Sequence, residues 1–111
     1  MNIHTDGSGK TGRYAYVVEK EGVIKIFQKR GITHNEAEYM AVIVALTENN
    51  AKEINIFSDS ELIVKQLNRN YKIKEKRMLD LALRVQKLCE GRSVTFTWIP
   101  RERNLAGKVL G

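Results

Sequence analysis

The stretch INIFSDSELIVKQLNRN, residues 54–70, changes character in its middle. Up to Ser60 it is a short apolar run that ends in polar side chains, which predicts a buried strand. From Glu61 onward its apolar residues recur at helical spacing, and Ser58 followed by Glu61 is typical of a helix cap. A strand that leads directly into a helix, with Asp59 at the junction, indicates an α/β fold.

Three further strands are predicted upstream of this stretch. Residues 13–20 (RYAYVVEK) and 23–30 (VIKIFQKR) alternate apolar with other side chains, and residues 21–22 between them predict a hairpin with a two-residue turn. The opening segment, residues 1–6 (MNIHTD), is the third strand candidate, and the glycine-rich loop 7–12 separates it from the hairpin.

Helical periodicity appears on both sides of the opening stretch. Thr33 followed by Glu36 predicts a capping box that begins the first helix. The remaining predicted elements are a helix over 35–46, a helix over 76–88, a strand over 93–100 and a short terminal helix over 103–111.

This order of elements predicts an α/β fold with a five-stranded mixed sheet flanked by helices. The first three strands follow one another closely and should pair antiparallel, whereas the two reached through helical crossovers should be parallel. The 111 residues contain one proline and no Gly/Ser-rich linker or repeat, so residues 1–111 are predicted to form a single domain.

The composition narrows the class of protein. Hydrophobic residues make up 42% and charged residues 29%, which is typical of a globular protein and excludes a disordered tail. The 19 Lys and Arg against 13 Asp and Glu give a net charge of +6, so a polyanion is the first partner to consider.

The one cysteine, Cys89, excludes an intrachain disulfide and a CxxC metal site, and we expect it to be a small buried residue. No apolar run is long enough to span a bilayer, and the N-terminal segment lacks the apolar stretch of a secretory signal. The sequence therefore predicts a cytoplasmic protein with no membrane partner.

Two aspartates fall at the carboxyl ends of predicted strands, where ligands bind in sheets of this kind. Asp6 ends the first strand and Asp59 ends the fourth. If a helical acid joins them, the like charges repel one another unless a cation neutralises them, and such oxygen ligands suit magnesium or manganese. The alternative is that both aspartates serve only as turn and helix-cap residues.

The helix over 35–46 offers two acids, and only one can face the sheet. Its predicted buried stripe consists of Ala37, Met40, Ala41 and Val44. Glu38 lies close to that stripe, whereas Glu36 is better used in the cap. We therefore predict Glu38 as the metal ligand.

Four local strings carry a specific resemblance. TDGSG (5–9), THNEAEY (33–39), SDSELIVKQLN (58–68) and WIPRERN (98–104) closely resemble, in order and spacing, the type 1 ribonuclease H family. The resemblance covers essentially the whole chain, and it implies a ribonuclease H-like fold.

The resemblance implies an endonuclease that hydrolyses the RNA strand of RNA/DNA hybrids with divalent metal ions and leaves 5′-phosphate products. Asp6, Glu38 and Asp59 match the family's first three catalytic metal ligands, with Asp6 bridging two ions. Mg²⁺ is the implied cofactor and Mn²⁺ a substitute. The implied partner is hybrid nucleic acid, and no obligate protein partner is evident.

Other matching positions concern the substrate. Thr33 and Asn35 correspond to positions that contact the nucleic-acid backbone, and Gly7 and Ser8 to positions that read RNA 2′-hydroxyls, the group that separates RNA from DNA. Gln66 could reach a minor-groove edge or could be an ordinary solvated helix residue. Asn104 is also predicted as a substrate-binding residue.

The loop before the last helix lacks the histidine that many members of the family place there. Arg101 or Arg103 could contact phosphate instead. The basic run 71–77 could also contact phosphates, or it could be a solvent-exposed surface. We interpret His4 as a structural residue. In the last strand, we expect Phe96 and Trp98 to be core aromatics.

The sequence departs from the family at the fourth acid. The family pattern is Asn, two residues, Ala-Asp, one residue, Leu-Ala, and alignment on Asn104 puts Lys108 at the aspartate. An ion could still be held more weakly, giving reduced activity, or Glu102 or Asn104 could replace the missing ligand. Alternatively, the Lys108 ammonium takes the place of the metal and leaves a non-catalytic hybrid- or duplex-binding protein. A nuclease of the same superfamily with another substrate is a third possibility.

Overall fold

The structure is a computed structural model that describes residues 1–70 and 72–111. Five strands form one sheet in the order β3-β2-β1-β4-β5. The strands are β1 (Asn2–Gly7), β2 (Arg13–Val18), β3 (Val23–Gln28), β4 (Glu53–Ser58) and β5 (Ser93–Trp98). The helices are α1 (His34–Glu48), α2 (Glu61–Leu67), α3 (Lys76–Leu88) and α4 (Leu105–Leu110), with a 3-10 turn at Arg101–Arg103.

The mixed sheet confirms the predicted topology. β1 pairs antiparallel with β2, and β2 pairs antiparallel with β3. β1 and β4 are parallel, as are β4 and β5, because helices carry the chain back between them. The parallel pairing of β1 with β4 brings the carboxyl ends of these two central strands to the same edge of the sheet.

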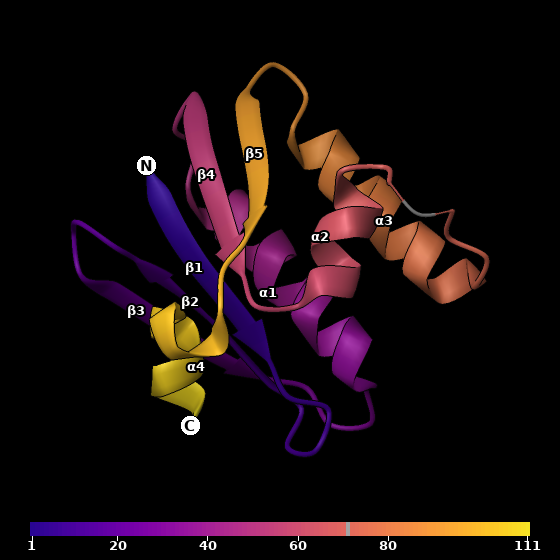
Figure 1. Ribbon diagram of the computed structural model, residues 1–111, viewed down its shortest axis with the longest axis horizontal. Helices are drawn as coiled ribbons and strands as arrows, with labels where there is room; N and C mark the ends of the chain where they lie inside the picture. The colour runs from indigo at the N-terminus through magenta and orange to yellow at the C-terminus, as the bar shows by residue number, and fades with distance from the viewer. Residues whose placement is uncertain (71) are drawn as a thin grey trace.

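The two faces of the sheet are covered unequally (Figure 1). α1 packs across β1 and β2 on one face, and α3 packs on α1. α4 covers β1 and β2 on the other face, where the Leu105 N–H donates to Nδ1 of His4 at 3.1 Å. His4 alternates with Ile3 and Thr5, so its side chain points away from the α1 side, and the structural role predicted for it agrees with this contact.

The hairpin between β2 and β3 differs from the prediction. Val18 pairs with Val23, so four residues connect the strands and not two. The loop closes through the Gly22 N–H, which donates to the Val18 carbonyl at 2.9 Å. Gly22 has a φ of 68°, a left-handed conformation that glycine adopts without strain.

The core lies between the sheet and the α1 and α3 layer. α1 is buried on more than the predicted stripe, because the sheet contacts one side of it and α3 another. The buried residues of α1 are Ala37, Glu38, Tyr39, Ala41, Val42, Ile43, Ala45 and Leu46. Met40 and Val44 of the predicted stripe are only half-buried.

Three local expectations also need correction. Trp98 is 48% exposed and is not a core aromatic, although Phe96 packs against the core. Cys89 is half-buried. The cap of α2 is Ser60, whose hydroxyl accepts the Ile63 N–H at 3.3 Å, and the Ser58 hydroxyl instead accepts the Ser60 N–H. Among the helices of the described residues, none combines the length and apolar character needed to cross a membrane.

Candidate metal centre

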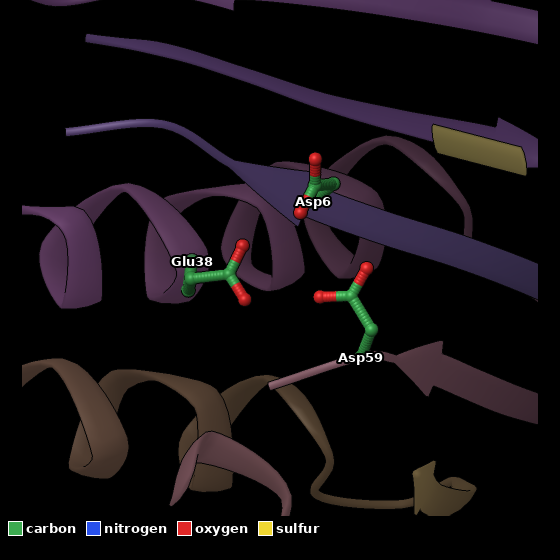
Figure 2. Close-up of side chains that lie close together, drawn as sticks. All are labelled: Asp6, Glu38 and Asp59. Atoms are coloured by element: carbon green, nitrogen blue, oxygen red, sulfur yellow. The ribbon is translucent and has the colours of Figure 1, made fainter. Parts of the chain in front are cut away.

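Three carboxylates converge at the edge of the sheet where β1 and β4 end. Asp6 comes from β1, Glu38 from α1, and Asp59 directly follows β4 (Figure 2). One oxygen from each side chain lies within 4.8 Å of the others. The pairing of Thr5 with Ser58 explains the proximity of the two aspartates, because each is the next residue along its strand.

Gly7 brings Glu38 into this group. A Cβ atom at Gly7 would overlap the backbone of Ala37 and Glu38, so only glycine lets α1 approach the end of β1 this closely. The Gly7 N–H donates to Oε1 of Glu38. The position of Glu38 in α1 therefore depends on a close backbone contact as well as on helical periodicity.

Glu36 has the other role predicted for it. The Thr33 hydroxyl accepts the Glu36 N–H at 3.1 Å, and the Glu36 carboxylate accepts the Thr33 N–H at 2.9 Å. These reciprocal bonds are the predicted capping box, and Glu36 is not among the acids that gather at the ends of β1 and β4.

The group of carboxylates is electrostatically strained without a cation. Glu38 is 2% exposed, and its Oε2 atom is buried with no hydrogen-bond partner among the described residues. Burial, and then the charge of Asp6, raise the pKa of Glu38 to about 9. Burial and the charge of Asp59 raise the pKa of Asp6. An unpartnered buried oxygen among clustered acids fits a divalent cation with hard oxygen ligands.

A cavity of about 230 Å³ opens beside the carboxylates. Its lining consists of Asp6, Gly7, Ser8, His34, Asp59, Arg101, Gly107, Leu110 and Gly111. The predicted substrate residues Gly7, Ser8 and Arg101 are therefore at the site. His34 was not predicted, although its place next to Asn35 in the THNEAEY string could have indicated it.

A sequence model of the RNase H family matches residues 1–106. The chain belongs to the RNase H family. Among solved structures it is similar to RNase H1 from the halophilic archaeon Halobacterium salinarum NRC-1, with 25% identity and a TM-score of 0.83 over 98% of this chain and 92% of that one. It is also similar to LC11-RNase H1, solved in complex with an RNA/DNA hybrid, with 26% identity and a TM-score of 0.82 over 99% of both chains.

Relatives with longer chains share the same region. The bifunctional protein Rv2228c of Mycobacterium tuberculosis is 34% identical over 76 residues, which are 65% of this chain and 21% of that protein. The solved N-terminal RNase H domain of that protein has a TM-score of 0.76 and 29% identity over 93% of this chain and 84% of that one. This chain thus matches about a fifth of the length of the mycobacterial relative.

Other residues expected to touch substrate lie outside the lining of the RNase H cavity. Thr33 is the exposed cap of α1, and Asn35 is half-buried beside it. Gln66 lines a separate groove of about 380 Å³ between α2 and α3, where its side-chain oxygen accepts the Tyr39 hydroxyl at 2.7 Å. Gln66 is therefore not among the residues that line the cavity beside the carboxylates, and its contact with substrate stays a prediction.

The basic run 71–77 is described from Lys72 onward, since Tyr71 lies outside the described residues. Its last two residues pair with acids of the helices. Lys76 lies 3.1 Å from Asp80, and Arg77 lies 3.6 Å from Glu36.

The end of the chain contributes Asn104 and Gly107 to the centre. Asn104 is fully buried, and its amide nitrogen donates to the Thr5 carbonyl at 2.9 Å and to Oδ2 of Asp59 at 3.1 Å. Its amide oxygen accepts two N–H groups at the start of α4. That oxygen already accepts two N–H groups in this arrangement, and the alternative of Asn104 as a substitute metal ligand stays a prediction. Glu102 is exposed and lies outside the cavity lining.

Lys108 is exposed and does not line the cavity. The residue of α4 that faces the carboxylates is Gly107. A Cβ atom there would lie 3.6 Å from Oδ2 of Asp59 and 3.7 Å from Oδ2 of Asp6. The side of α4 next to the carboxylates is therefore open space and not an ammonium group.

Proposed function

We propose that this chain is a metal-dependent endoribonuclease that hydrolyses the RNA strand of RNA/DNA hybrids and leaves 5′-phosphate and 3′-hydroxyl ends. One observation carries the proposal: in a chain of the RNase H family, three carboxylates meet at the ends of β1 and β4, and one buried oxygen among them has no partner. Its similarity to a structure solved with an RNA/DNA hybrid supports the choice of substrate.

Asp6, Glu38 and Asp59 would hold the ion, for which magnesium is the first choice and manganese the substitute. When bound, a divalent ion polarises a phosphoryl oxygen and lowers the pKa of a coordinated water. The protein supplies a rigid set of carboxylates, because Gly7 fixes Glu38 and Asn104 fixes Asp59.

The remaining residues of the cavity fit a phosphodiester. Arg101 brings a permanent positive charge to a cavity that otherwise carries acids, which suits a phosphate oxygen. The Gly7 and Ser8 N–H groups are used within the protein, by Glu38 and by the Arg13 carbonyl. Recognition of an RNA 2′-hydroxyl at this loop therefore falls to the Ser8 side chain.

A non-catalytic hybrid-binding protein is the rival function, because Lys108 stands at the family's fourth acid position. The exposure of Lys108 and its absence from the cavity lining favour the nuclease. The ammonium group does not occupy the space between the carboxylates, so the three acids remain able to bind a cation.

The test is cleavage of an end-labelled RNA/DNA hybrid in Mg²⁺ and, separately, in Mn²⁺. We expect the parent to cut the RNA strand and Asp6→Asn to lose more than about 100-fold in rate, beyond the usual effect of residues around a metal site. Asp80→Asn is the matched control, because this exposed carboxylate pairs only with Lys76 among the described residues.

Three other results would count against the proposal. Hybrid binding without cleavage in either ion would favour the binding protein. Equal cleavage by the parent and Asp6→Asn would contradict the assignment of Asp6 as a metal ligand. Preferential cleavage of duplex DNA or double-stranded RNA would show that the RNA/DNA hybrid is not the preferred substrate.

A further inference from the structure

The exposed side chain of Trp98 contacts the backbone of Asp59. The indole N–H donates to the Asp59 carbonyl at 3.1 Å. The same peptide group is held at its other polar atom, because the Ser60 N–H donates to the Ser58 hydroxyl at 3.0 Å. Both polar atoms of the peptide that follows Asp59 are thus bonded to side chains.

This peptide lies in a very short connection. Only Asp59 and Ser60 join β4 to α2. The strand that carries Trp98 is fixed to β4 at the same level, since Ser58 and Trp98 are register partners and the Ile99 N–H donates to the Ser58 carbonyl at 2.9 Å. The pairing of β4 with β5 therefore positions the indole N–H next to the Asp59 carbonyl.

The bonds to this peptide restrain the backbone from which the Asp59 carboxylate projects. The carbonyl that accepts the indole N–H is bonded directly to the Cα of Asp59, so holding this carbonyl against β5 limits how far that Cα can shift. Ser60 caps α2, which leaves it little freedom to compensate. Asn104 holds the carboxylate of Asp59 directly, so the segment 98–104 constrains both the backbone and the side chain of this residue.

We propose that Trp98 is a positioning residue that sets the affinity of the centre for divalent ions by fixing the peptide after Asp59. The inference rests on the proposed function in taking Asp59 as a metal ligand. Trp98 itself touches no ion in this account. Its half-exposed ring is consistent with this role, because a tryptophan that only filled the core would be buried.

The experiment measures Mn²⁺ binding to the intact chain by isothermal titration calorimetry, together with the melting temperature in EDTA. Trp98→Phe keeps an aromatic ring and removes the N–H donor. We expect it to weaken Mn²⁺ binding about tenfold, as outer residues of metal sites do, with a much smaller change in metal-free stability. Ser58→Ala releases the same peptide from its other end and should act in the same direction.

The double variant tests whether both side chains act through one peptide. Because either substitution alone frees that peptide, the double variant should lose less Mn²⁺ binding free energy than the two single variants lose together. Phe96→Leu is the matched control: it disturbs β5 packing two residues before Trp98, and it should lower stability while leaving Mn²⁺ affinity near the parent value.

Each outcome has a distinct meaning. A parent that binds no Mn²⁺ overturns the proposed function and this inference with it. A parent that binds, with Trp98→Phe binding equally well, overturns the inference alone. Equal weakening by Phe96→Leu also overturns it, because general damage to β5 would then explain the loss. If Trp98→Phe does not fold, the affinity of Ser58→Ala decides between these results.

Discussion

Asn104 donates to the Asp59 carboxylate at 3.1 Å while its own amide oxygen accepts the Ala106 N–H at 3.0 Å and the Gly107 N–H at 3.3 Å. One fully buried side chain therefore orients a carboxylate of the candidate metal centre and also begins α4. The two roles need a donor and an acceptor on the same short side chain, which asparagine provides and aspartate does not.

Asn104→Asp separates these two roles. The new carboxylate can still cap α4, but it faces Asp59 where a donor stood. We expect the metal-free protein to lose about 1–3 kcal/mol of unfolding free energy, the usual cost of an unsatisfied buried group. Urea denaturation in EDTA measures the loss, and saturating Mg²⁺ should recover part of it. Asn55→Asp, at an amide pair on the exposed part of the sheet, is the control and should change little.

The stability of the metal-free protein should fall as the pH rises. The pKa of Glu38 is about 9 in the folded chain, against an ordinary value of 4.5, so the folded state retains a proton that the unfolded state releases. Stability from this group is fully present below about pH 4.5 and is lost progressively up to about pH 9. The raised pKa of Asp6 acts in the same direction. Thermal denaturation in EDTA across this range measures the trend.

Glu38→Gln should flatten that pH dependence and stabilise the metal-free protein above neutral pH. Saturating Mg²⁺ should also flatten it in the parent, because a bound cation favours the ionised carboxylate. Glu36→Gln is the control in the same helix. The capping bond with the Thr33 backbone lowers the pKa of Glu36. The stability that Glu36 contributes is therefore lost as the pH falls and not as it rises. A parent whose stability stays constant from pH 5 to 9 in EDTA would contradict the prediction.

The order of the elements and the three acids could be predicted from the sequence because each depends on local patterns. Alternation identified the strands, and the capping box fixed where α1 begins, so Glu38 could be chosen over Glu36. What local patterns miss is contact between distant segments. The wide burial of α1 comes from α3, and the exposure of Trp98 accompanies its position at the end of β5, the edge strand of the sheet.

Two further details have the same physical origin. The substrate role of Gln66 stays a prediction, but its oxygen accepts the hydroxyl of Tyr39, 27 positions earlier in the chain, which no local pattern shows. Ser58 and Ser60 are equally good caps by composition. The closer one to α2 became the cap, since the end of β4 still pairs with β5 at Ser58.

Arg92 fastens the ends of two helices together. Its guanidinium donates to the carbonyls of Leu46 at 2.9 Å and Asn49 at 2.6 Å, near the end of α1, and to Leu88 at the end of α3. Arg92→Ala leaves these carbonyls without their donor and should cost about 2–3 kcal/mol. Arg92→Lys keeps the charge but not the planar guanidinium, so its stability should lie between that of the parent and that of Arg92→Ala. Denaturant unfolding measures the order, and an Arg92→Lys variant as stable as the parent would show that charge alone suffices.

Gly107 and Lys108 offer two places for a fourth carboxylate, and the structure favours the first. A side chain at 107 would start 3.6 Å from Asp59 Oδ2 with nothing nearer, whereas Lys108 lies on the exposed side of α4. Gly107→Asp should therefore tighten Mn²⁺ binding in a calorimetric titration and lower metal-free stability through like-charge repulsion. Lys108→Asp changes the net charge twice as much, so a larger effect of Gly107→Asp cannot arise from net charge. If Lys108→Asp alone tightens binding, α4 presents residue 108 to the ion, as the alignment with the family implies.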